Sequence, residues 1–255
     1  IIIPTLNRSE ALHKCLDSLE AQTFKDFEII LIEEEGPLAK LRNEGAKRAK
    51  GEILSFIDDD VICTLRWLET IVKTFEEKKV QGVSGPAIIR NPRNRDIFKY
   101  RFFKYLYDKF FLQGRQNLPG HITRSGAWTT GASKEECNYE GPVDFLEACN
   151  MSFTKKAFEE VDGFDESYEG IGDWSEPDLS FRIRHKEGKL WFNPEVILYH
   201  EVSKTGAFTK RKRDSHRRLS NYLIFSNRFV PNCFSHVCYK LFLRTYYMLK
   251  VRGLC

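Results

Sequence analysis

Residues 41–60 have the sequence LRNEGAKRAKGEILSFIDDD. We predict a helix over 38–49, and the apolar run EILSFI at 52–57 is typical of a buried strand. Three carboxylates, Asp58 to Asp60, follow that strand directly. A helix, a buried strand and a polar turn are the parts of a βαβ unit, in which ligands bind beyond the carboxyl ends of the strands.

The same alternation of strand and helix extends to both sides of this stretch. Strands are expected at 1–3, 27–32 and 80–89, and helices after the N-cap Ser9 and over 65–77. Strands that alternate with helices at this spacing predict an α/β fold with a mainly parallel sheet. Residues 1–90 therefore resemble a Rossmann-like half-domain.

The composition fits one large α/β domain or two small ones, with 255 residues, 42% of them apolar and 30% charged. These fractions exclude a disordered tail protein and a collagen-like fibre. No apolar run reaches the roughly 18 residues of a transmembrane helix, and no signal peptide is expected. The seven cysteines are scattered without a CxxC pair, which argues against a disulfide framework or a structural zinc site. A reducing, cytoplasmic location is the expectation.

The regular pattern breaks over residues 91–140, where basic and aromatic residues mix and a Gly-rich piece follows. This segment is expected to be an insertion or a lid. Order returns with VDFLEACNMSF at 143–153 and a helix near 155–161. A helix is then expected to begin near Glu176, and strand-like pieces lead up to His200.

Asp58, Asp59 and Asp60 are the strongest chemical signal in the chain. Like charges this close repel one another, and a hard divalent cation would relieve that repulsion. Oxygen ligands suit Mg²⁺ or Mn²⁺, and such a cation bridges naturally to a diphosphate. The alternative is a helix N-cap with acidic residues in the first turn, which the helix dipole favours.

Other polar residues are expected at the same edge of the sheet. Glu33 ends the second strand, where it could accept from a base N–H or a ribose hydroxyl, or belong to a solvated loop. Arg42 could reach a phosphate or lie on a helix surface. The turn after the first strand supplies Pro4, Thr5, Asn7 and Arg8.

Taken together, these pieces resemble the family 2 glycosyltransferases, which have the GT-A fold. IIIPTLNR resembles their opening strand and loop, and LRNEGAKRAKGEILSFIDDD their ARNxGxxxAxGExxxFxDxD segment. LEACNMSFTKKAFEEVDGFDE is similar to their acceptor-side block, and WSEPDLSFRIR to their ED-x-D-L-x-x-R helix start. The chain departs from the family where the second strand ends in EEEG rather than VDDGS, which bears on the base and ribose contacts.

The resemblance implies metal-assisted, inverting transfer of a sugar from a nucleotide-diphosphate sugar to an acceptor hydroxyl, on a glycan or a lipid-linked molecule. Glu176 falls where the family's general base, usually Asp, lies. Asp58 and Asp59 would bind the nucleotide sugar, and Asp60, His200 and Asp58 would hold Mn²⁺ or Mg²⁺. Trp174 and Asp178 would face the acceptor. A structural histidine at 200 and core packing of Trp174 are the alternatives.

The expected organisation is a catalytic domain over 1–200, with a nucleotide-binding half (1–90), the 91–140 segment and an acceptor and metal half (141–200). A basic helical extension follows over 201–255. That extension carries 12 Lys/Arg against 2 Asp/Glu, whereas the rest of the chain carries 28 against 34. An acidic body joined to a basic tail predicts separate roles for the two parts.

The tail interleaves cations with apolar and aromatic residues, a pattern that favours peripheral binding to an anionic membrane surface on the cytoplasmic side. Packing of its apolar stripe on the catalytic domain is the first alternative. Nucleic-acid binding is the second, and no RNA-binding motif supports it.

Two rival functions are open from the residues alone. A sugar-1-phosphate nucleotidyltransferase also uses an α/β sheet and metal, but it needs a Gly-rich first loop, and PTLNRSE contains no glycine. A non-catalytic nucleotide-sugar-binding module would tolerate the loss of Glu176. Sugar transfer measured with and without Mn²⁺ separates these functions.

Overall fold

The computed structural model describes residues 1–6, 9–90, 101–129, 131, 137–201 and 215–251. The first half of the chain contains β1 (Ile2–Pro4), α1 (Ser9–Glu20), β2 (Ile30–Ile32), α2 (Leu38–Arg48), β3 (Ile53–Ile57), β4 (Val61–Cys63), α3 (Trp67–Lys78), β5 (Gly82–Ser84) and β6 (Ala87–Ile89). The second half contains α4 (Arg101–Leu106), the π-helical segment η1 (Tyr107–Leu112), β7 (Gly141–Pro142), β8 (Asn150–Thr154), α5 (Lys155–Glu159), α6 (Ser175–His185), β9 (Leu190–Phe192), β10 (Leu198–His200), α8 (Ser215–Phe229) and α9 (Phe234–Val251).

The main sheet has the strand order β2-β1-β3-β8-β5-β9-β7. β2, β1 and β3 are parallel, and β8 lies antiparallel between β3 and β5. The predicted α/β fold is therefore confirmed, with a mixed sheet to which residues 1–90 and residues 141–200 both contribute strands. The antiparallel insertion of β8 is a long-range pairing that the local pattern does not encode.

The segment predicted as a single strand over 80–89 forms two strands in two sheets. Gly85 and Pro86 separate β5 from β6. Proline has no N–H to donate to a strand ladder, so pairing stops there. β6 joins a second sheet of order β4-β10-β6, in which His200 lies opposite Val61.

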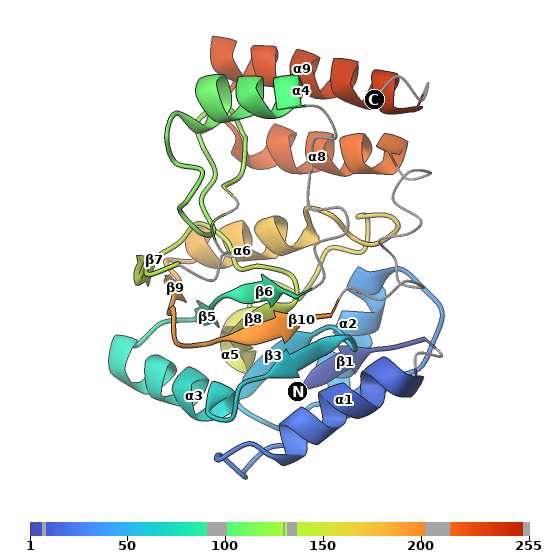
Figure 1. Ribbon diagram of the computed structural model, residues 1–255, viewed down its shortest axis with the longest axis vertical. Coiled ribbons are helices and arrows are strands. Elements are labelled where there is room, and N and C mark those ends of the chain that lie inside the picture. The colour runs from blue at the N-terminus through green and yellow to red at the C-terminus, as the bar shows by residue number, and fades with distance from the viewer. Residues whose placement is uncertain (7–8, 91–100, 130, 132–136, 202–214, 252–255) are drawn as a thin grey trace.

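Helices cover both faces of the main sheet (Figure 1). On one face α2, α5 and α6 contribute Ala39, Phe158 and Leu179 to a buried cluster centred on Phe56 and Phe153. On the other face, α1 and α3 pack around the fully buried Trp67. The apolar strands predicted from the sequence are buried because both of their faces are covered.

A third cluster, built mainly from aromatic residues, lies beyond α6. There α4, η1, α8 and α9 stack at the end of the molecule that is farthest from α1 and α3 (Figure 1). Phe111 of η1 contacts Tyr239 and Phe242 of α9, with ring centroids 4.9 and 5.1 Å apart. The predicted helical extension is thus present, and it packs on part of the 91–140 segment.

Of the predicted basic extension over 201–255, residues 202–214 and 252–255 lie outside the described residues. Among the helices that the structure describes, none is both long enough and apolar enough to cross a bilayer.

Candidate functional site

The three consecutive carboxylates lie at the carboxyl end of β3, as the sequence predicts. Asp59 and Asp60 are buried, whereas the Asp58 side chain is 29% exposed. The Thr5 hydroxyl donates a 2.6 Å hydrogen bond to Oδ2 of Asp59. Because Thr5 follows β1, this bond joins the carboxyl ends of two adjacent parallel strands and fixes the turn that carries the carboxylates.

His200 ends β10 and meets these carboxylates from the second sheet. Its Nε2 lies 3.0 Å from Oδ1 of Asp60 and 4.0 Å from Oδ2 of Asp58. Burial by itself lowers the pKa of His200, but the neighbouring Cys149, Asp60 and Asp58 raise it to about 11. The site thus concentrates negative charge around one position, which a cation would neutralise.

Cys149 is a residue that the sequence reasoning missed. Ligand atoms of Asp58, Cys149 and His200 all lie within 4.8 Å of one another. The sheet register explains the meeting, because Ile57 of β3 pairs with Asn150 of β8 and the next positions outward are Asp58 and Cys149. Nothing in the LEACN segment indicates that Cys149 lies beside Asp58 and His200. That position follows only from the pairing of β3 with β8.

Arg42 of α2 connects this cluster to the first turn of α6. Its side chain is 1% exposed, and its Nη1 donates a 2.7 Å hydrogen bond to Oε1 of Glu176. Its Nη2 lies 3.8 Å from Oδ1 of Asp58 and donates to the carbonyl of Ala148. The guanidinium therefore has its partners inside the protein, and the phosphate contact expected from the sequence stays a prediction.

Glu176 lies in the first turn of α6 and is 6% exposed. Burial raises the pKa of Glu176 above its ordinary value, and Arg42 opposes that rise. Glu147, a second carboxylate that sequence reasoning did not select, has a pKa of about 7 because burial and then the charge of Glu176 disfavour its ionisation. A carboxylate with a raised pKa is a stronger base than a surface glutamate, which suits proton transfer near neutral pH.

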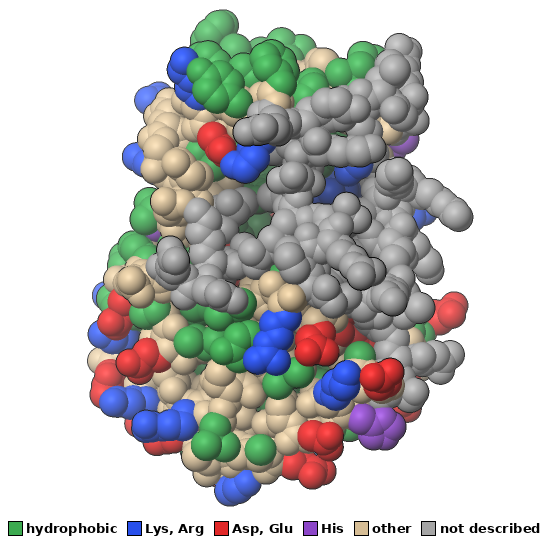
Figure 2. All heavy atoms as spheres, viewed as in Figure 1, with side chains coloured by type: hydrophobic (Ala, Val, Ile, Leu, Met, Phe, Trp, Pro, Cys, Tyr) green, Lys and Arg blue, Asp and Glu red, His purple; other side chains and the backbone are tan. Residues whose placement is uncertain are grey.

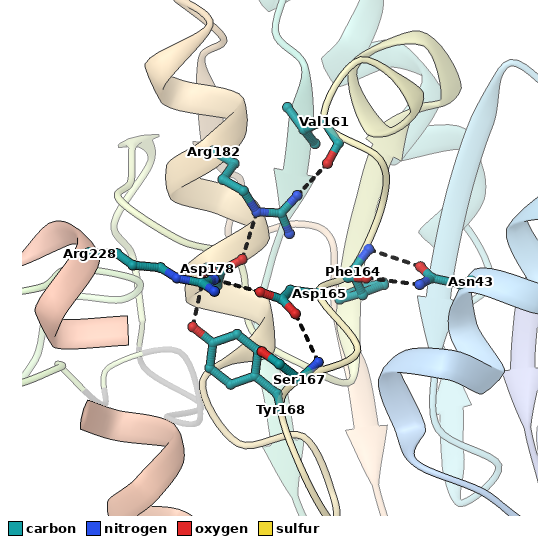
Figure 3. Close-up of polar contacts among 9 residues, drawn as sticks. All are labelled: Asn43, Val161, Phe164, Asp165, Ser167, Tyr168, Asp178, Arg182 and Arg228. Carbon is teal, nitrogen blue, oxygen red and sulfur yellow. Dashed lines mark hydrogen bonds and ion pairs between the residues drawn. The ribbon is translucent and has the colours of Figure 1, made fainter. Parts of the chain in front are cut away.

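Asp178 is fully buried and forms a polar network of its own (Figure 3). It accepts from the Tyr168 hydroxyl at 3.0 Å, from Nε of Arg182 at 2.6 Å and from Nη1 of Arg228 at 2.8 Å. Trp174 is 4% exposed and stacks on Phe225 of α8 with ring centroids 4.9 Å apart. For Trp174 this geometry fits the core-packing alternative, and an acceptor role for either residue stays a prediction.

Two of the remaining predicted residues, Pro4 and Glu33, lie at the ends of neighbouring strands. Pro4 is the last residue of β1, and Glu33 is exposed directly after β2. Asn7 and Arg8 lie outside the described residues. The structure thus brings Asp58, Asp60, His200 and Glu176 into one neighbourhood, and Arg42 is the side chain that joins Asp58 to Glu176.

Two solved structures show the same fold at low sequence identity. A mannosyltransferase from Pyrobaculum calidifontis, in complex with GDP-Man and Mn²⁺, superposes with a TM-score of 0.56 at 18% identity, over 97% of this chain and 68% of that one. TarS from S. aureus in complex with UDP-GlcNAc gives a TM-score of 0.60 at 12% identity, over 99% and 72% of the two chains.

Curated relatives agree with this fold. Human polypeptide N-acetylgalactosaminyltransferase 12 is 26% identical over 174 residues, which is 66% of this chain and 28% of the relative. The glucosyl-dolichyl phosphate glucuronosyltransferase of Haloferax volcanii is 20% identical over 78% of this chain and 66% of its own length. The chain therefore spans only about a quarter of the human relative.

The family model described as glycosyl transferase family 2 matches residues 1–37 and 33–135, which is more than half of the chain. The match includes the β1 turn, α2 and the carboxylates after β3, which the structure shows at one sheet edge. The chain belongs to glycosyltransferase family 2.

Proposed function

We propose that this protein is an inverting glycosyltransferase that moves a sugar from a nucleotide-diphosphate sugar to an acceptor hydroxyl, with Glu176 as general base. The observation that carries the proposal is Arg42, which lies 2.7 Å from Glu176 and 3.8 Å from Asp58. One buried side chain thus connects Glu176, the carboxylate suited to proton transfer, with Asp58, which belongs to the proposed cation site beside the diphosphate.

The donor set fits a divalent cation such as Mn²⁺ or Mg²⁺. Nε2 of His200 lies 4.0 Å from a carboxylate oxygen of Asp58 and 3.0 Å from one of Asp60, and the two carboxylates outnumber the single imidazole in charge. When bound there, a cation would neutralise the charge that develops on the leaving diphosphate. Mn²⁺ in the structurally similar mannosyltransferase supports this choice.

In the proposed reaction, the acceptor oxygen forms a bond to C1 of the sugar while the bond from C1 to the diphosphate oxygen breaks. The acceptor proton passes to Glu176, and the bonding electrons leave with the nucleoside diphosphate. Attack from the face opposite the leaving group inverts the configuration at C1. Arg42 fixes the orientation of Glu176 and keeps part of its charge compensated, so that the carboxylate is ionised when the acceptor arrives.

The proposed donor is a nucleotide sugar. GDP-Man and UDP-GlcNAc in two similar structures support a nucleotide sugar as donor. Glu33, Pro4 and Thr5 lie at the sheet edge where a nucleotide would bind in an α/β fold, and we assign them to donor binding. We assign the acceptor-binding side to α6. The acceptor hydroxyl belongs to a glycan or to a lipid-linked molecule.

We further propose that the protein binds the cytoplasmic face of a membrane through the helices beyond α6. Apolar side chains gather at that end of the molecule (Figure 2). Phe102, Phe110 and Leu241 are 65%, 57% and 57% exposed on α4, η1 and α9. The sequence of α9 contains no Asp or Glu, so its charges favour an anionic surface.

The test of the proposed activity is Glu176→Gln, which keeps the size of the side chain but removes the basic oxygen. Donor binding should survive, and transfer should fall by roughly 10²–10⁴-fold, the usual contribution of a general base. Glu187→Gln, at an exposed position just past α6, is the matched control and should transfer normally.

The rival functions give different outcomes in the same assay. A binding module would show donor binding without transfer in the native chain. A nucleotidyltransferase would release pyrophosphate from a nucleoside triphosphate. Near-normal transfer by Glu176→Gln would contradict the assignment of the base.

A further inference from the structure

Cys149 places a sulfur atom in the cation site, and the proposed transfer gives that sulfur no role. Its Sγ, a carboxylate oxygen of Asp58 and a ring nitrogen of His200 all lie within 4.8 Å of one another. The three residues come from three strands, at the end of β3, just before β8 and at the end of β10. Strand ends held by ladder pairing form a preorganised triad rather than a chance surface cluster.

The spacing suits a single small cation after a modest adjustment of rotamers. Two ligand atoms on one tetrahedral zinc ion lie roughly 3.3–3.6 Å apart, given bond lengths of about 2.0–2.3 Å. The imidazole of His200 and the carboxylate of Asp58 are already at 4.0 Å. Pairs that are as far as 4.8 Å apart need a closure of about 1.2–1.5 Å, shared between flexible side chains, to reach that spacing.

The chemistry of the donors then selects the cation. A thiolate is a soft ligand that favours zinc-like ions over Mg²⁺, whereas an all-oxygen site favours the hard ions. Three protein ligands with a fourth position open is the arrangement of reactive zinc sites, and the 29% exposure of Asp58 leaves one side accessible.

We propose that Asp58, Cys149 and His200 together bind a thiophilic divalent cation, for which Zn²⁺ and Co²⁺ are the probes, with the fourth position open to water or a donor phosphate. Binding releases the thiol proton of Cys149, and the imidazolium proton of His200, to solvent. The inference names the class of cation for the site in the proposed function, but it is tested without donor, acceptor or turnover. The class of cation and the transfer chemistry on Glu176 can therefore fail separately.

The donor set named above for Mn²⁺ or Mg²⁺, Asp58, Asp60 and His200, leaves the sulfur unbound and is the arrangement against which this one is tested. Zinc binds most donor sets more tightly than manganese does, so a preference for Zn²⁺ over Mn²⁺ would not by itself distinguish the two arrangements. The sulfur contact has to be observed directly.

The experiment titrates the full chain with Co²⁺ and records the near-ultraviolet band of thiolate-to-cobalt charge transfer. The band should appear in the native protein and in Cys238→Ser, a control thiol on α9 that is also half-buried. It should be absent from Cys149→Ser. Calorimetry should show that Cys149→Ser loses Zn²⁺ affinity by about 10–100-fold, while Mn²⁺ affinity changes less.

A second measurement on the native chain covers the case in which Cys149→Ser does not fold. Zn²⁺ should protect Cys149 from alkylation by iodoacetamide, mapped by mass spectrometry, while Cys238 stays equally reactive. A charge-transfer band that persists in Cys149→Ser, or alkylation of Cys149 at an undiminished rate with Zn²⁺ bound, would overturn the proposal.

Discussion

At the residue scale, Arg42 decides the electrostatics of the candidate base. The sequence places Arg42 on a helix that carries several other cations, and nothing local distinguishes it from Arg48 on the same helix. The structure does distinguish them: Arg42 is 1% exposed and bound to Glu176, whereas Arg48 is half exposed and pairs with Glu34 at 3.1 Å. Only Arg42 is close enough to Glu176, and buried enough, to change the pKa of that carboxylate by an interaction that solvent does not screen.

This difference predicts the pH dependence of transfer. Glu176 must be ionised to accept a proton, so the rate should fall as the pH drops through its raised pKa. Arg42 lowers the pKa of Glu176, so Arg42→Gln should move this acidic limb to higher pH. Arg48→Gln is the control and should leave the limb in place. The measurement is kcat against pH, and an unmoved limb in Arg42→Gln would show that Glu176 does not carry the titration.

Gly45 gives a prediction about stability at the same scale. It lies in the middle of α2, where alanine would ordinarily stabilise a helix by up to about 1 kcal/mol. Here a Cβ would overlap Cγ2 of Ile2 in β1, so Gly45→Ala should instead lower the free energy of unfolding by about 1–3 kcal/mol.

The control for that substitution is Gly51→Ala. A Cβ on Gly51 meets only the carbonyl oxygen of Ile53, at an ordinary 3.6 Å, so the change should stay within about 0.5 kcal/mol. Both variants are measured by urea unfolding. Equal stability of the two would mean that α2 packs less closely on β1 than the structure indicates.

At the scale of elements, Arg228 provides one of the polar contacts that hold α8 against α6, beside the aromatic packing of Phe225 on Trp174. Nη1 of Arg228 lies 2.8 Å from the fully buried Asp178 of α6 and 2.6 Å from Asp165 (Figure 3). α6 also carries Glu176, so the docking of α8 and the position of the base depend on the same helix. The two residues of this contact are 50 positions apart in the sequence, and no local pattern connects them.

Removing this contact should loosen α8. Arg228→Met should cost about 1.5–3 kcal/mol, the range for hydrogen bonds to charged groups, because Asp178 is buried. Arg217→Met on the same helix, whose pairing with Glu169 at 3.6 Å is exposed, should cost less than about 1 kcal/mol. Chemical unfolding, with hydrogen exchange over 215–229, measures both. Equal costs for the two variants would contradict the docking role.

The cost of Arg228→Met should also depend on pH. Partial burial opposes the ionisation of Asp165, but hydrogen bonds from Ser167 and Arg228 hold its pKa below the ordinary 3.8. A carboxylate whose pKa is lowered on folding stabilises the protein at pH values above its unfolded pKa. This stabilisation is lost as the pH falls through the folded pKa. The difference between native chain and variant should therefore shrink below about pH 4.

At the scale of the whole molecule, two ends of different character are visible. The end with α1 and α3 carries mixed charges, while the end with α4 and α9 presents apolar side chains (Figure 2). Lys104, Lys109 and Arg244 are exposed on α4, η1 and α9. The inner faces of α8 and α9 form one aromatic core with η1. Deleting the C-terminal helices would expose that core, so membrane binding is better tested by substitutions on the outer face.

Leu241→Ser combined with Phe110→Ser should weaken binding to vesicles that contain phosphatidylserine by about tenfold or more, since each buried apolar side chain contributes about 1.5–3 kcal/mol. Added salt should weaken binding of the native chain further. The control is Leu65→Ser, an exposed leucine ahead of α3, which should bind normally. Vesicle co-sedimentation measures the bound fraction of each protein. Equal binding of the native chain and the double variant would show that this face does not contact the membrane.

The sequence by itself determined the α/β class, the positions of β1, β3 and α2, and the carboxylates after β3. These features depend on periodicity and on apolar runs within about ten residues, which are local properties. Helical spacing and composition also predicted the C-terminal extension, whereas Glu176 and His200 were selected as site residues by the family resemblance. The family resemblance placed them in one enzyme, but it did not supply their distances.

The tertiary structure alone decided which of these residues meet. The pairing of β3 with β8 brings Cys149 beside Asp58, and the pairing of β10 with β4 brings His200 onto Asp60. The burial of Arg42 converts a helix cation into the partner of Glu176. Each of these contacts joins residues that are far apart in the chain. Such long-range contacts depend on how whole helices and strands pack, and no local pattern of residue types encodes that packing.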